Sequence, residues 1–174
     1  DKNSFKEIGR LTGLGEYNDN GILKKLTPVN SVIGHAKINK MPVVIYGDDF
    51  TVRGGAADAA IHEKMIAAER FANEYKMPLI RLIEGTGGGG SVKSIEQDGY
   101  TYVPANPGWD WVGSNMATIP VVSLGLGPVA GLGAARLVSS HYSIIVKKMS
   151  QVFVAGPPVV NRLGETVTKE SLGG

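Results

Sequence analysis

The order of apolar and polar residues along the chain predicts strands and helices in alternation. Two apolar segments, residues 32–39 and 42–46, are separated by a turn at Asn39-Lys40, and Asp48-Asp49 ends the second segment. The sequence Pro42-Val43-Val44-Ile45-Tyr46 is a nearly continuous apolar run, as in a buried strand. We therefore predict two strands joined by a short turn.

Residues 56–76 change to a helical period. Charged and amide side chains fall away from one apolar face, which carries Ile61, Met65, Ala68, Ala72 and Tyr75. Pro78 ends this helix, and the apolar run at residues 79–83 predicts another strand. A strand, a helix and a strand with short connections predict a right-handed parallel crossover.

The rest of the chain repeats this order after a long polar stretch. Residues 91–107 are longer than most loops of compact domains, so we expect a lid or a partner-facing segment there. A short helix, a strand, a helix and two strands are expected at residues 109–117, 119–124, 129–138, 142–146 and 152–155, in that order. The pattern predicts a single α/β domain.

Composition excludes several classes of protein and site. The 174 residues carry a net charge of +2, and the basic residues are scattered, which argues against nucleic-acid binding. The absence of cysteine excludes disulfides, cysteine zinc sites and thiol nucleophiles, and it fits a reducing compartment. His35, His62 and His141 are far apart, so we expect no metal site. No apolar run approaches the roughly 20 residues of a membrane span.

Glycine is unusually abundant, with 24 residues of 174 against a usual share of about 7%. The glycines gather at Gly54-Gly55, at Gly85 and residues 87–90, and between Gly125 and Gly133, and each group follows a predicted strand. They are either flexible turns or places where the backbone approaches a ligand closely. Since loops at the carboxyl ends of parallel strands meet on one side of a sheet, their N–H groups could stabilise the enolate of a deprotonated thioester.

Other glycine-based sites have weaker support. The sequence lacks a G-x-S-x-G hydrolase motif, and residues 85–91 lack the lysine of a phosphate-binding P-loop. Residues 125–130 match the dinucleotide pattern G-x-G-x-x-A between a predicted strand and a predicted helix. The acidic residue expected near the end of the next strand is absent, and Lys147-Lys148 stands there instead. A dinucleotide site is therefore the weaker alternative.

Seven short segments resemble, in order, motifs of the β subunits of biotin-dependent acyl-CoA carboxyltransferases. The segments are Ser4–Gly9 (SF-x-E-I-G), Asp48–Gly55 (DFTVRGG), His62–Lys64 (H-x-K-K), Thr86–Gly89 (SGGA), Gly127–Gly131 (GPCAGG), Phe153–Pro157 (F-L-x-G-P) and Glu170–Gly174 (E-E-L-G-G). They span nearly the whole chain. Each alone is weak, but together they are specific.

The resemblance implies an α/β crotonase-like superhelix of β-β-α units. It also implies carboxyl transfer from carboxybiotin to the α-carbon of an acyl-CoA, with this half of the subunit binding the CoA thioester. Carried over from the family motif, the backbone oxyanion hole is Gly131 and Leu132, and Leu132 departs from the family's second glycine. The residues expected to bind the substrate are Gly54, Gly55, Gly87, Gly88, Gly89 and Gly133.

The resemblance further implies the setting of this domain. Residues 1–174 would form one N-terminal, CoA-ester-binding domain of a longer chain, in the cytoplasm or, in a eukaryote, in the mitochondrial matrix. The expected cofactor is biotin on a carrier. The expected partners are acyl-CoA, a biotin carboxyl carrier protein, biotin carboxylase and further copies of the subunit, without nucleic acid. Because the biotin-binding half is not represented, we expect no complete carboxyl transfer by the isolated chain.

Three alternatives remain open. A decarboxylase subunit of the same family would pass the carboxyl group to biotin for a sodium pump. A crotonase-type hydratase would use a carboxylate such as Glu84, which is more typical of a strand end. A non-catalytic scaffold is the third, with residues 109–112 as either a subunit contact or part of a packed helix. Arg53, Lys37 and Arg81 could meet CoA phosphates but are more typical of solvated charges.

Overall fold

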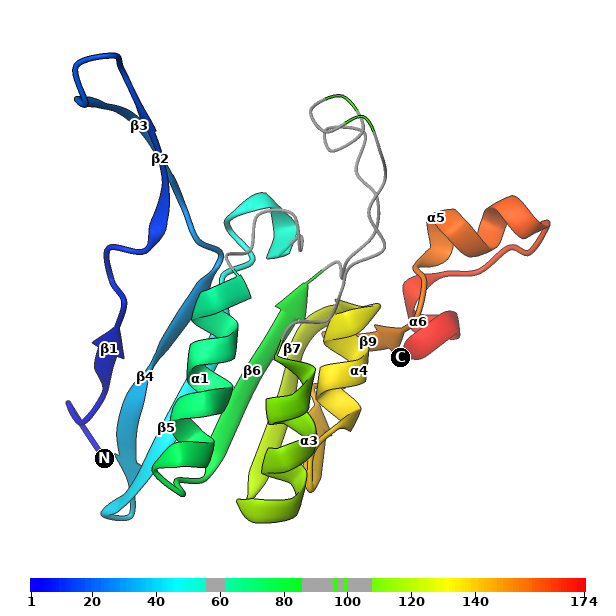
Figure 1. The fold of residues 1–174 in the computed structure, drawn as a ribbon. Coiled ribbons are helices and arrows are strands. Elements are labelled where there is room, and N and C mark those ends of the chain that lie inside the picture. The colour runs from blue at the N-terminus through cyan, green and yellow to red at the C-terminus, as the bar shows by residue number, and fades with distance from the viewer. Residues whose placement is uncertain (56–61, 86–95, 97–98, 100–107) are drawn as a thin grey trace.

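A mixed β-sheet forms the centre of the molecule in the computed structural model, which describes residues 1–55, 62–85, 96, 99 and 108–174 (Figure 1). Within this part of the chain the sheet has seven strands in the order β1-β4-β5-β6-β7-β8, and β9 pairs with the carboxyl end of β7. The first two pairings are antiparallel and all the others are parallel. The strands are β1 (Lys6–Ile8), β4 (Ser31–Ile38), β5 (Met41–Asp48), β6 (Leu79–Gly85), β7 (Val121–Ala130), β8 (Tyr142–Ile145) and β9 (Gln151–Phe153).

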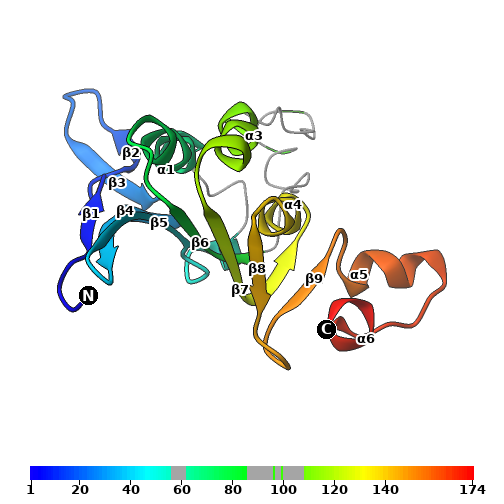
Figure 2. The same cartoon turned by 90° about the horizontal axis from the view of Figure 1, so that it is seen from below.

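Helices of the described residues cover one face of this sheet, as Figure 2 shows. They are α1 (His62–Glu74), α3 (Trp109–Thr118) and α4 (Leu132–Val138). The 3-10 turn η1 (Arg53–Gly55) follows β5. The short elements α5 (Pro157–Val160), η3 (Asn161–Leu163) and α6 (Lys169–Gly173) lie beyond the β9 edge. None of the helices in the described residues is long and apolar enough to cross a membrane.

The strands and helices predicted from the apolar pattern are confirmed in outline. The turn at Asn39-Lys40 joins β4 to β5, and its two residues have φ angles of 49° and 69°, as a two-residue hairpin turn requires. α1 starts at His62, and the first six residues of the predicted helix, 56–61, lie outside the described residues. The polar stretch 91–107 also lies outside them, apart from residues 96 and 99.

The strand predicted at residues 119–124 is longer than expected, and the helix after it starts later. β7 continues to Ala130, and α4 begins at Leu132 rather than at residue 129. Alternate residues of β7 are buried along its whole length, so the strand period continues through its glycines. The G-x-G-x-x-A sequence therefore lies inside a strand, and the predicted strand-to-helix turn at this sequence is wrong.

A separate two-stranded sheet is not predicted from the sequence. It consists of β2 (Gly13–Tyr17) and β3 (Leu23–Pro28), and it projects from the rest of the molecule (Figure 1). Nearly all of its residues are exposed, and they include the apolar Leu14, Tyr17 and Leu26. Since neither face of this hairpin is buried in the described structure, no alternation of apolar and polar residues marks its strands.

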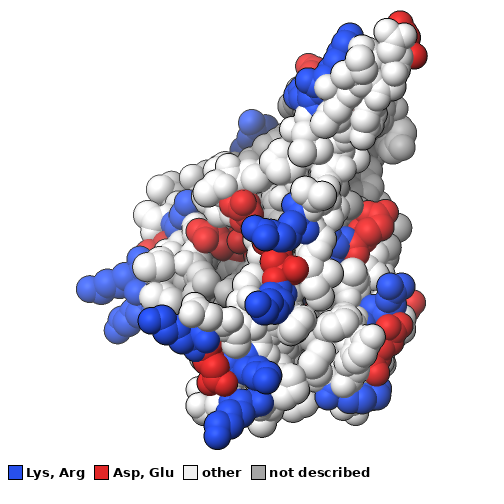
Figure 3. Space-filling model, turned by 90° about the vertical axis from the view of Figure 1, so that its left-hand side faces the viewer, with Lys and Arg blue, Asp and Glu red and all other residues white. Residues whose placement is uncertain are grey.

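Charged side chains of both signs are intermingled on the side of the molecule that carries β1 and the projecting hairpin (Figure 3). Several of them form pairs, such as Lys25 with Glu16 at 2.8 Å and Arg10 with Glu7 at 3.4 Å. A nucleic-acid-binding face normally shows a basic stripe instead. This face therefore gives no support to nucleic-acid binding.

The interior between the sheet and the helices contains two apolar clusters with polar side chains between them. The larger cluster consists of Ile33, Val44, Tyr46, Ala68, Ala72, Leu79, Ile119 and Val121. The smaller cluster consists of Ile83, Val129, Ala134 and Leu137. On β6 the buried Arg81 stands between Leu79 of the larger cluster and Ile83 of the smaller, at alternate positions on one face. A polar layer thus separates the two clusters along the strands.

Candidate active site

The glycine segments after β5 and β6 meet at one edge of the sheet. A Cβ atom on Gly55 would lie 2.7 Å from the carbonyl oxygen of Glu84 and 2.8 Å from Cα of Gly85. A Cβ atom on Gly85 would lie 2.8 Å from the carbonyl oxygen of Gly55. Gly55 also has a φ of +67°, which glycine adopts without strain. The two backbones approach so closely that only glycine fits at both positions, in agreement with the predicted convergence.

Glu84 joins the end of β6 to the ends of its two neighbours. Its backbone N–H donates to Oδ2 of Asp48 at 3.0 Å, which ties it to the end of β5. Its carboxyl group lies directly over Gly127 of β7, where a Cβ atom would be 2.6 Å from Cδ of Glu84. The carboxyl ends of the three strands therefore form one continuous edge, which we call the glycine edge (Gly54, Gly55, Glu84, Gly85, Gly127 and residues 131–133).

Gly131 makes the turn from β7 into α4. Its φ and ψ of 56° and −124° favour glycine, and its N–H donates to the carbonyl oxygens of Phe153 and Val154, both at 3.1 Å. The first helical bond runs from the Ala135 N–H to the Gly131 carbonyl at 3.1 Å. The N–H groups of Leu132 and Gly133 therefore precede the hydrogen-bond ladder of the helix.

Leu132 fits the position where the family motif has glycine. It is the first residue of α4 and is not among the residues with a positive φ angle. The need for glycine thus falls on Gly131, and a leucine at the next position keeps its N–H without backbone strain.

The remaining expected substrate-binding residues are placed as follows. Gly54 lies in η1 with a φ of 62°. Gly133 packs on the smaller apolar cluster, since a Cβ atom there would be 3.3 Å from Cγ1 of Val129 and 3.7 Å from Cγ2 of Ile83. β6 is therefore the common neighbour of η1 and α4. Gly87, Gly88 and Gly89 lie outside the described residues.

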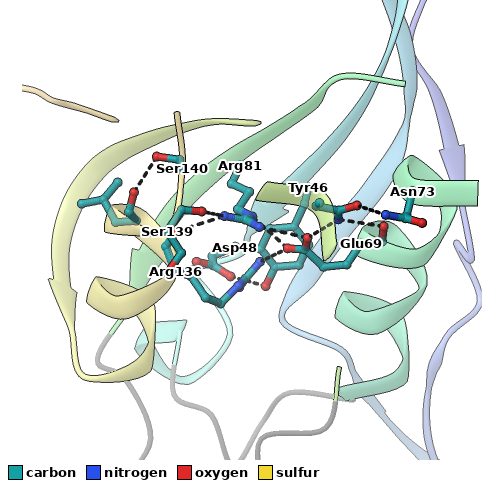
Figure 4. Close-up of polar contacts among 10 residues, drawn as sticks. Tyr46, Asp48, Glu69, Asn73, Arg81, Arg136, Ser139 and Ser140 are labelled. Atoms are coloured by element: carbon teal, nitrogen blue, oxygen red, sulfur yellow. Dashed lines mark hydrogen bonds and ion pairs between the residues drawn. The ribbon is translucent and has the colours of Figure 1, made fainter. Parts of the chain in front are cut away.

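Beneath the glycine edge lies a group of buried polar side chains that sequence analysis did not assign to a site. We call it the buried polar cluster, and Figure 4 shows its contacts. Arg81 forms two hydrogen bonds with Glu69, from Nε to Oε1 at 2.8 Å and from Nη2 to Oε2 at 2.9 Å. The Arg136 guanidinium lies 3.6 Å from the same carboxylate and 4.3 Å from the ring centroid of Tyr46. Its members are Tyr46, Asp48, Glu69, Arg81, Asn115 and Arg136.

The cluster connects α1, α3 and α4 with β5 and β6. Asn115 of α3 donates to Oε2 of Glu69 at 2.9 Å and accepts from Asn73 of α1 at 2.9 Å. The Tyr46 hydroxyl donates to the carboxylate of Asp48, which also accepts the N–H of Glu84. One connected set of polar contacts therefore runs from the interior of the helix layer to the glycine edge.

Burial changes the acidity of the two β5 members of the cluster. It raises the pKa of the Asp48 carboxyl above its ordinary value, although the Arg136 charge and the hydrogen bonds from Tyr46 and Glu84 oppose this. Burial also raises the pKa of Tyr46, so that its hydroxyl stays protonated and remains a donor to Asp48.

The family described as the carboxyl transferase domain matches residues 1–174. The chain belongs to this family. The mitochondrial methylcrotonoyl-CoA carboxylase beta chain of Dictyostelium discoideum is 30% identical over 179 residues, which cover 98% of this chain and 28% of that protein. The methylmalonyl-CoA decarboxylase subunit alpha of Veillonella parvula is 29% identical over 179 residues, which cover 100% of this chain and 33% of that protein.

Solved structures share the fold of this carboxyl transferase domain. The transcarboxylase 12S structure with methylmalonyl-coenzyme A and methylmalonic acid bound matches with a TM-score of 0.76 at 25% identity. The match covers 100% of this chain and 33% of that chain. The predicted fold, the crotonase-like fold of carboxyltransferase β subunits, is confirmed. The domain spans only 28% to 33% of the length of the two relatives named above.

The sequence positions of two charged residues of the domain indicate that their side chains are buried. Arg81 interrupts an apolar strand, and the proposal that it meets a CoA phosphate or solvent is wrong, because its side chain is fully buried against Glu69. Glu69 lies four residues after Met65 and three before Ala72, so it falls on the apolar face of α1. A charge at such a position indicates a buried partner, which a single sequence does not identify.

The other candidates of the domain have ordinary surroundings. Lys37 and His35 are exposed on β4. The His141 ring accepts the N–H of Val121 at 3.1 Å and lies 3.0 Å from the Met116 carbonyl, so it joins α3 to β7. No group of three or more potential metal ligands occurs among the described residues. In α3 Val112 is buried while its two tryptophans are half-exposed, which leaves both interpretations of this segment open.

Proposed function

We propose that this chain is the CoA-ester-binding part of a biotin-dependent acyl-CoA carboxyltransferase. Membership of the carboxyl transferase family supports this reaction class, and the relatives named above are a carboxylase and a decarboxylase of CoA esters. The transcarboxylase structure that shares its fold carries methylmalonyl-coenzyme A. Each of these properties belongs to the relatives, and the proposal extends them to this chain.

The glycine edge is the observation that carries the proposal. Three strand ends meet there with their backbones in close contact at Gly55 and Gly85. Removal of a proton from the α-carbon of a thioester places negative charge on the thioester oxygen, and main-chain N–H groups stabilise such a charge. A site built from backbone suits this reaction because main-chain N–H groups alone stabilise the enolate, and the carboxyl group would come from carboxybiotin.

The oxyanion donors proposed from the family motif are the amides of Gly131 and Leu132. The Gly131 N–H is engaged by two carbonyl groups at the end of β9, whereas the Leu132 and Gly133 N–H groups lie at the start of α4. We therefore assign the principal role to Leu132, with Gly133 beside it. One donor of this kind stabilises a transition state by about 3 kcal/mol.

Carboxybiotin would supply the carboxyl group from its carrier protein. We assign none of the described residues to carboxybiotin binding, and we expect the biotin-binding half elsewhere in the full-length protein. The complete reaction is therefore tested in the full-length protein with its carrier and biotin carboxylase, and substrate binding is tested first.

Isothermal titration with acetyl-, propionyl- and methylcrotonyl-CoA tests the binding step, with free CoA as the reference. We expect at least one acyl-CoA to bind more tightly than free CoA. If no acyl-CoA binds, the non-catalytic scaffold becomes the better description.

Replacement of Leu132 by proline tests the oxyanion assignment. Proline is well tolerated at the first position of a helix, so Leu132→Pro removes the N–H while the helix is retained. The carboxyl-transfer kcat should fall roughly 100-fold, by the usual effect of losing one oxyanion donor. Leu132→Ala keeps the N–H and is the matched control, with kcat close to that of the wild type. Equal kcat values for the two variants would contradict the assignment.

The decarboxylase direction is the second candidate, because the Veillonella relative is 29% identical over 100% of this chain, close to the 30% over 98% for the Dictyostelium carboxylase chain. The two directions are distinguished by measuring carboxyl transfer to and from biotin in the assembled complex, with and without sodium. Net transfer to biotin that depends on sodium would identify the decarboxylase.

A further inference from the structure

The position of α4 depends on its contacts with buried charged side chains, because the helix is too short to be stable by itself. It has seven residues, and its first turn belongs to the glycine edge. A helix this short is marginal in isolation, so its position depends on its tertiary contacts. The contacts that fix it decide where the Leu132 and Gly133 amides lie.

Arg81 of β6 holds the carboxyl end of α4. Its Nη1 donates to the carbonyl oxygens of Arg136 at 3.1 Å and Ser139 at 2.6 Å. The other nitrogens of the same guanidinium are hydrogen-bonded to Glu69 of α1. Because a guanidinium is planar and rigid, these bonds fix the orientation of α4 relative to β6 and α1 together.

Arg136 fixes α4 from the helix itself. Its side chain reaches across the interior to the ring of Tyr46 and to the carboxylate of Glu69. Tyr46 continues to Asp48, and Asp48 to the N–H of Glu84 at the glycine edge. The buried polar cluster thus reaches the glycine edge along two routes, through α4 and through the ends of β5 and β6.

Stability alone does not explain these charges. Replacing a buried ion pair with apolar residues of similar volume is often neutral or stabilising, because burial of each charge is costly. Arg136 is buried, and among the described residues its Nε and Nη2 have no hydrogen-bond partner, although Nη2 is paired with Glu69 at 3.6 Å. Since two buried guanidinium nitrogens make no hydrogen bond within the described part of the chain, the orientation that Arg136 imposes on α4 explains its presence better than stability does.

We propose that Arg81 and Arg136 are positioning residues for carboxyl transfer, which set the amides at the start of α4 against the Gly55–Gly85 contact. The inference rests on the proposed function, since it concerns the same oxyanion donors. It goes further by assigning a role in the reaction to two buried charges that touch no substrate.

The test compares Arg136→Met with Arg136→Lys in the full-length protein, assayed with its carrier and biotin carboxylase. Methionine keeps an unbranched apolar stem, shorter than that of arginine, and removes the charge. A displaced reactive geometry should lower kcat roughly 10- to 100-fold, with the KM for acyl-CoA nearly unchanged, because positioning acts on the reacting geometry. Lysine should restore part of kcat. Arg70→Met removes an exposed arginine beside Glu69 and should leave both constants unchanged.

A double variant shows whether Arg136 acts through the amide of Leu132. In a Leu132→Pro background the donor is already lost, so Arg136→Met should lower kcat by far less than it does in the wild type. Equal effects in both backgrounds would overturn the inference. If Arg136→Met fails to fold, Arg81→Lys replaces it, because lysine keeps the charge but loses the planar contacts with α4.

The outcomes separate the two proposals. A wild-type protein that transfers no carboxyl group overturns the proposed function and the inference with it. An active wild type with an unchanged kcat in Arg136→Met, or with a raised KM alone, overturns only the inference. In that case the cluster serves the fold or substrate binding.

Discussion

Individual glycines in this protein serve opposite purposes. Gly55 and Gly85 lie where two backbone segments are in contact. A side chain on either residue would clash with main-chain atoms, which cannot move away as a flexible side chain can. Gly113 lies within α3, where an added Cβ atom would meet nothing within 4 Å. The same residue type is therefore required at the glycine edge and unfavourable in the helix.

Alanine substitutions should separate these two cases. Gly55→Ala should lower the free energy of unfolding by about 1–3 kcal/mol, because it combines a backbone clash with a strained positive φ. Gly113→Ala should raise it by about 0.5–1 kcal/mol, since alanine is the better helix former. Urea denaturation monitored by circular dichroism measures both. An unchanged or raised free energy of unfolding in Gly55→Ala would show that the Gly55–Gly85 contact is not tight.

Asp48 should make the stability of the protein depend on pH. The pKa of Asp48 is raised in the folded state, so the folded protein holds the proton of this carboxyl group more tightly than the unfolded chain does. The stabilisation that results is fully present below the ordinary carboxyl pKa of about 3.9, and it is lost as the pH rises through the pKa of the folded state. Asp48→Asn lacks this loss. We therefore subtract the free energy of unfolding of the wild type from that of Asp48→Asn. This difference should increase between about pH 3.5 and pH 7.

Urea denaturation of both proteins at several pH values gives this difference directly. All other carboxyl groups are common to the two proteins, and their effects largely cancel. A difference that stays constant or decreases with pH would show that Asp48 has an ordinary or lowered pKa in the folded protein.

At the scale of elements, apolar periodicity located the central strands and the three packed helices. The turn at Asn39-Lys40 is predicted because polar residues separate two apolar runs, and α1 because its apolar residues recur with a helical period. The extension of β7 is not predicted, because its glycines and proline are typical of turns. Only the close packing of Glu84, Ile145 and Leu137 on those glycines shows why a strand continues there.

The candidate site was predicted in part. The glycine groups are visible in the sequence because they interrupt apolar runs, whereas the buried polar cluster depends on contacts between residues far apart in the chain. Arg81 and Arg136 are separated by 55 positions, and Glu69 and Asn115 by 46. A single sequence has no period or motif that would pair them.

Removal of the carboxylate shared by the two arginines should be costly. Glu69→Gln leaves two buried guanidinium groups without their charged partner, and we expect a loss of about 3–5 kcal/mol in the free energy of unfolding. The control is Glu74→Gln in the exposed Arg70–Glu74 pair, which should cost about 0.5 kcal/mol or less. Urea denaturation compares the two. Similar costs would mean that the buried ion pairs contribute little.

At the scale of the whole molecule, the described part of the chain is a sheet covered by helices on one face, with a hairpin that projects from it (Figures 1 and 2). A two-stranded hairpin is marginally stable without further packing. Nearly all side chains of β2 and β3, including apolar ones, are exposed in this structure and do not belong to either apolar cluster. This hairpin contributes little to the core that supports the glycine edge.

The division of the interior into two clusters has a consequence for how the molecule opens. Among the described residues the smaller cluster has four buried members against eight in the larger, and it supports α4 and the Gly131 contact with the end of β9. Amide exchange measured by mass spectrometry should therefore reveal a partial opening of α4 and β9 at a lower free energy than that of α1 and β5. Uniform exchange energies would contradict this. The α4 side of the glycine edge, where a CoA ester would be held, is then the part that loosens first, while its β5 side stays folded with the larger cluster.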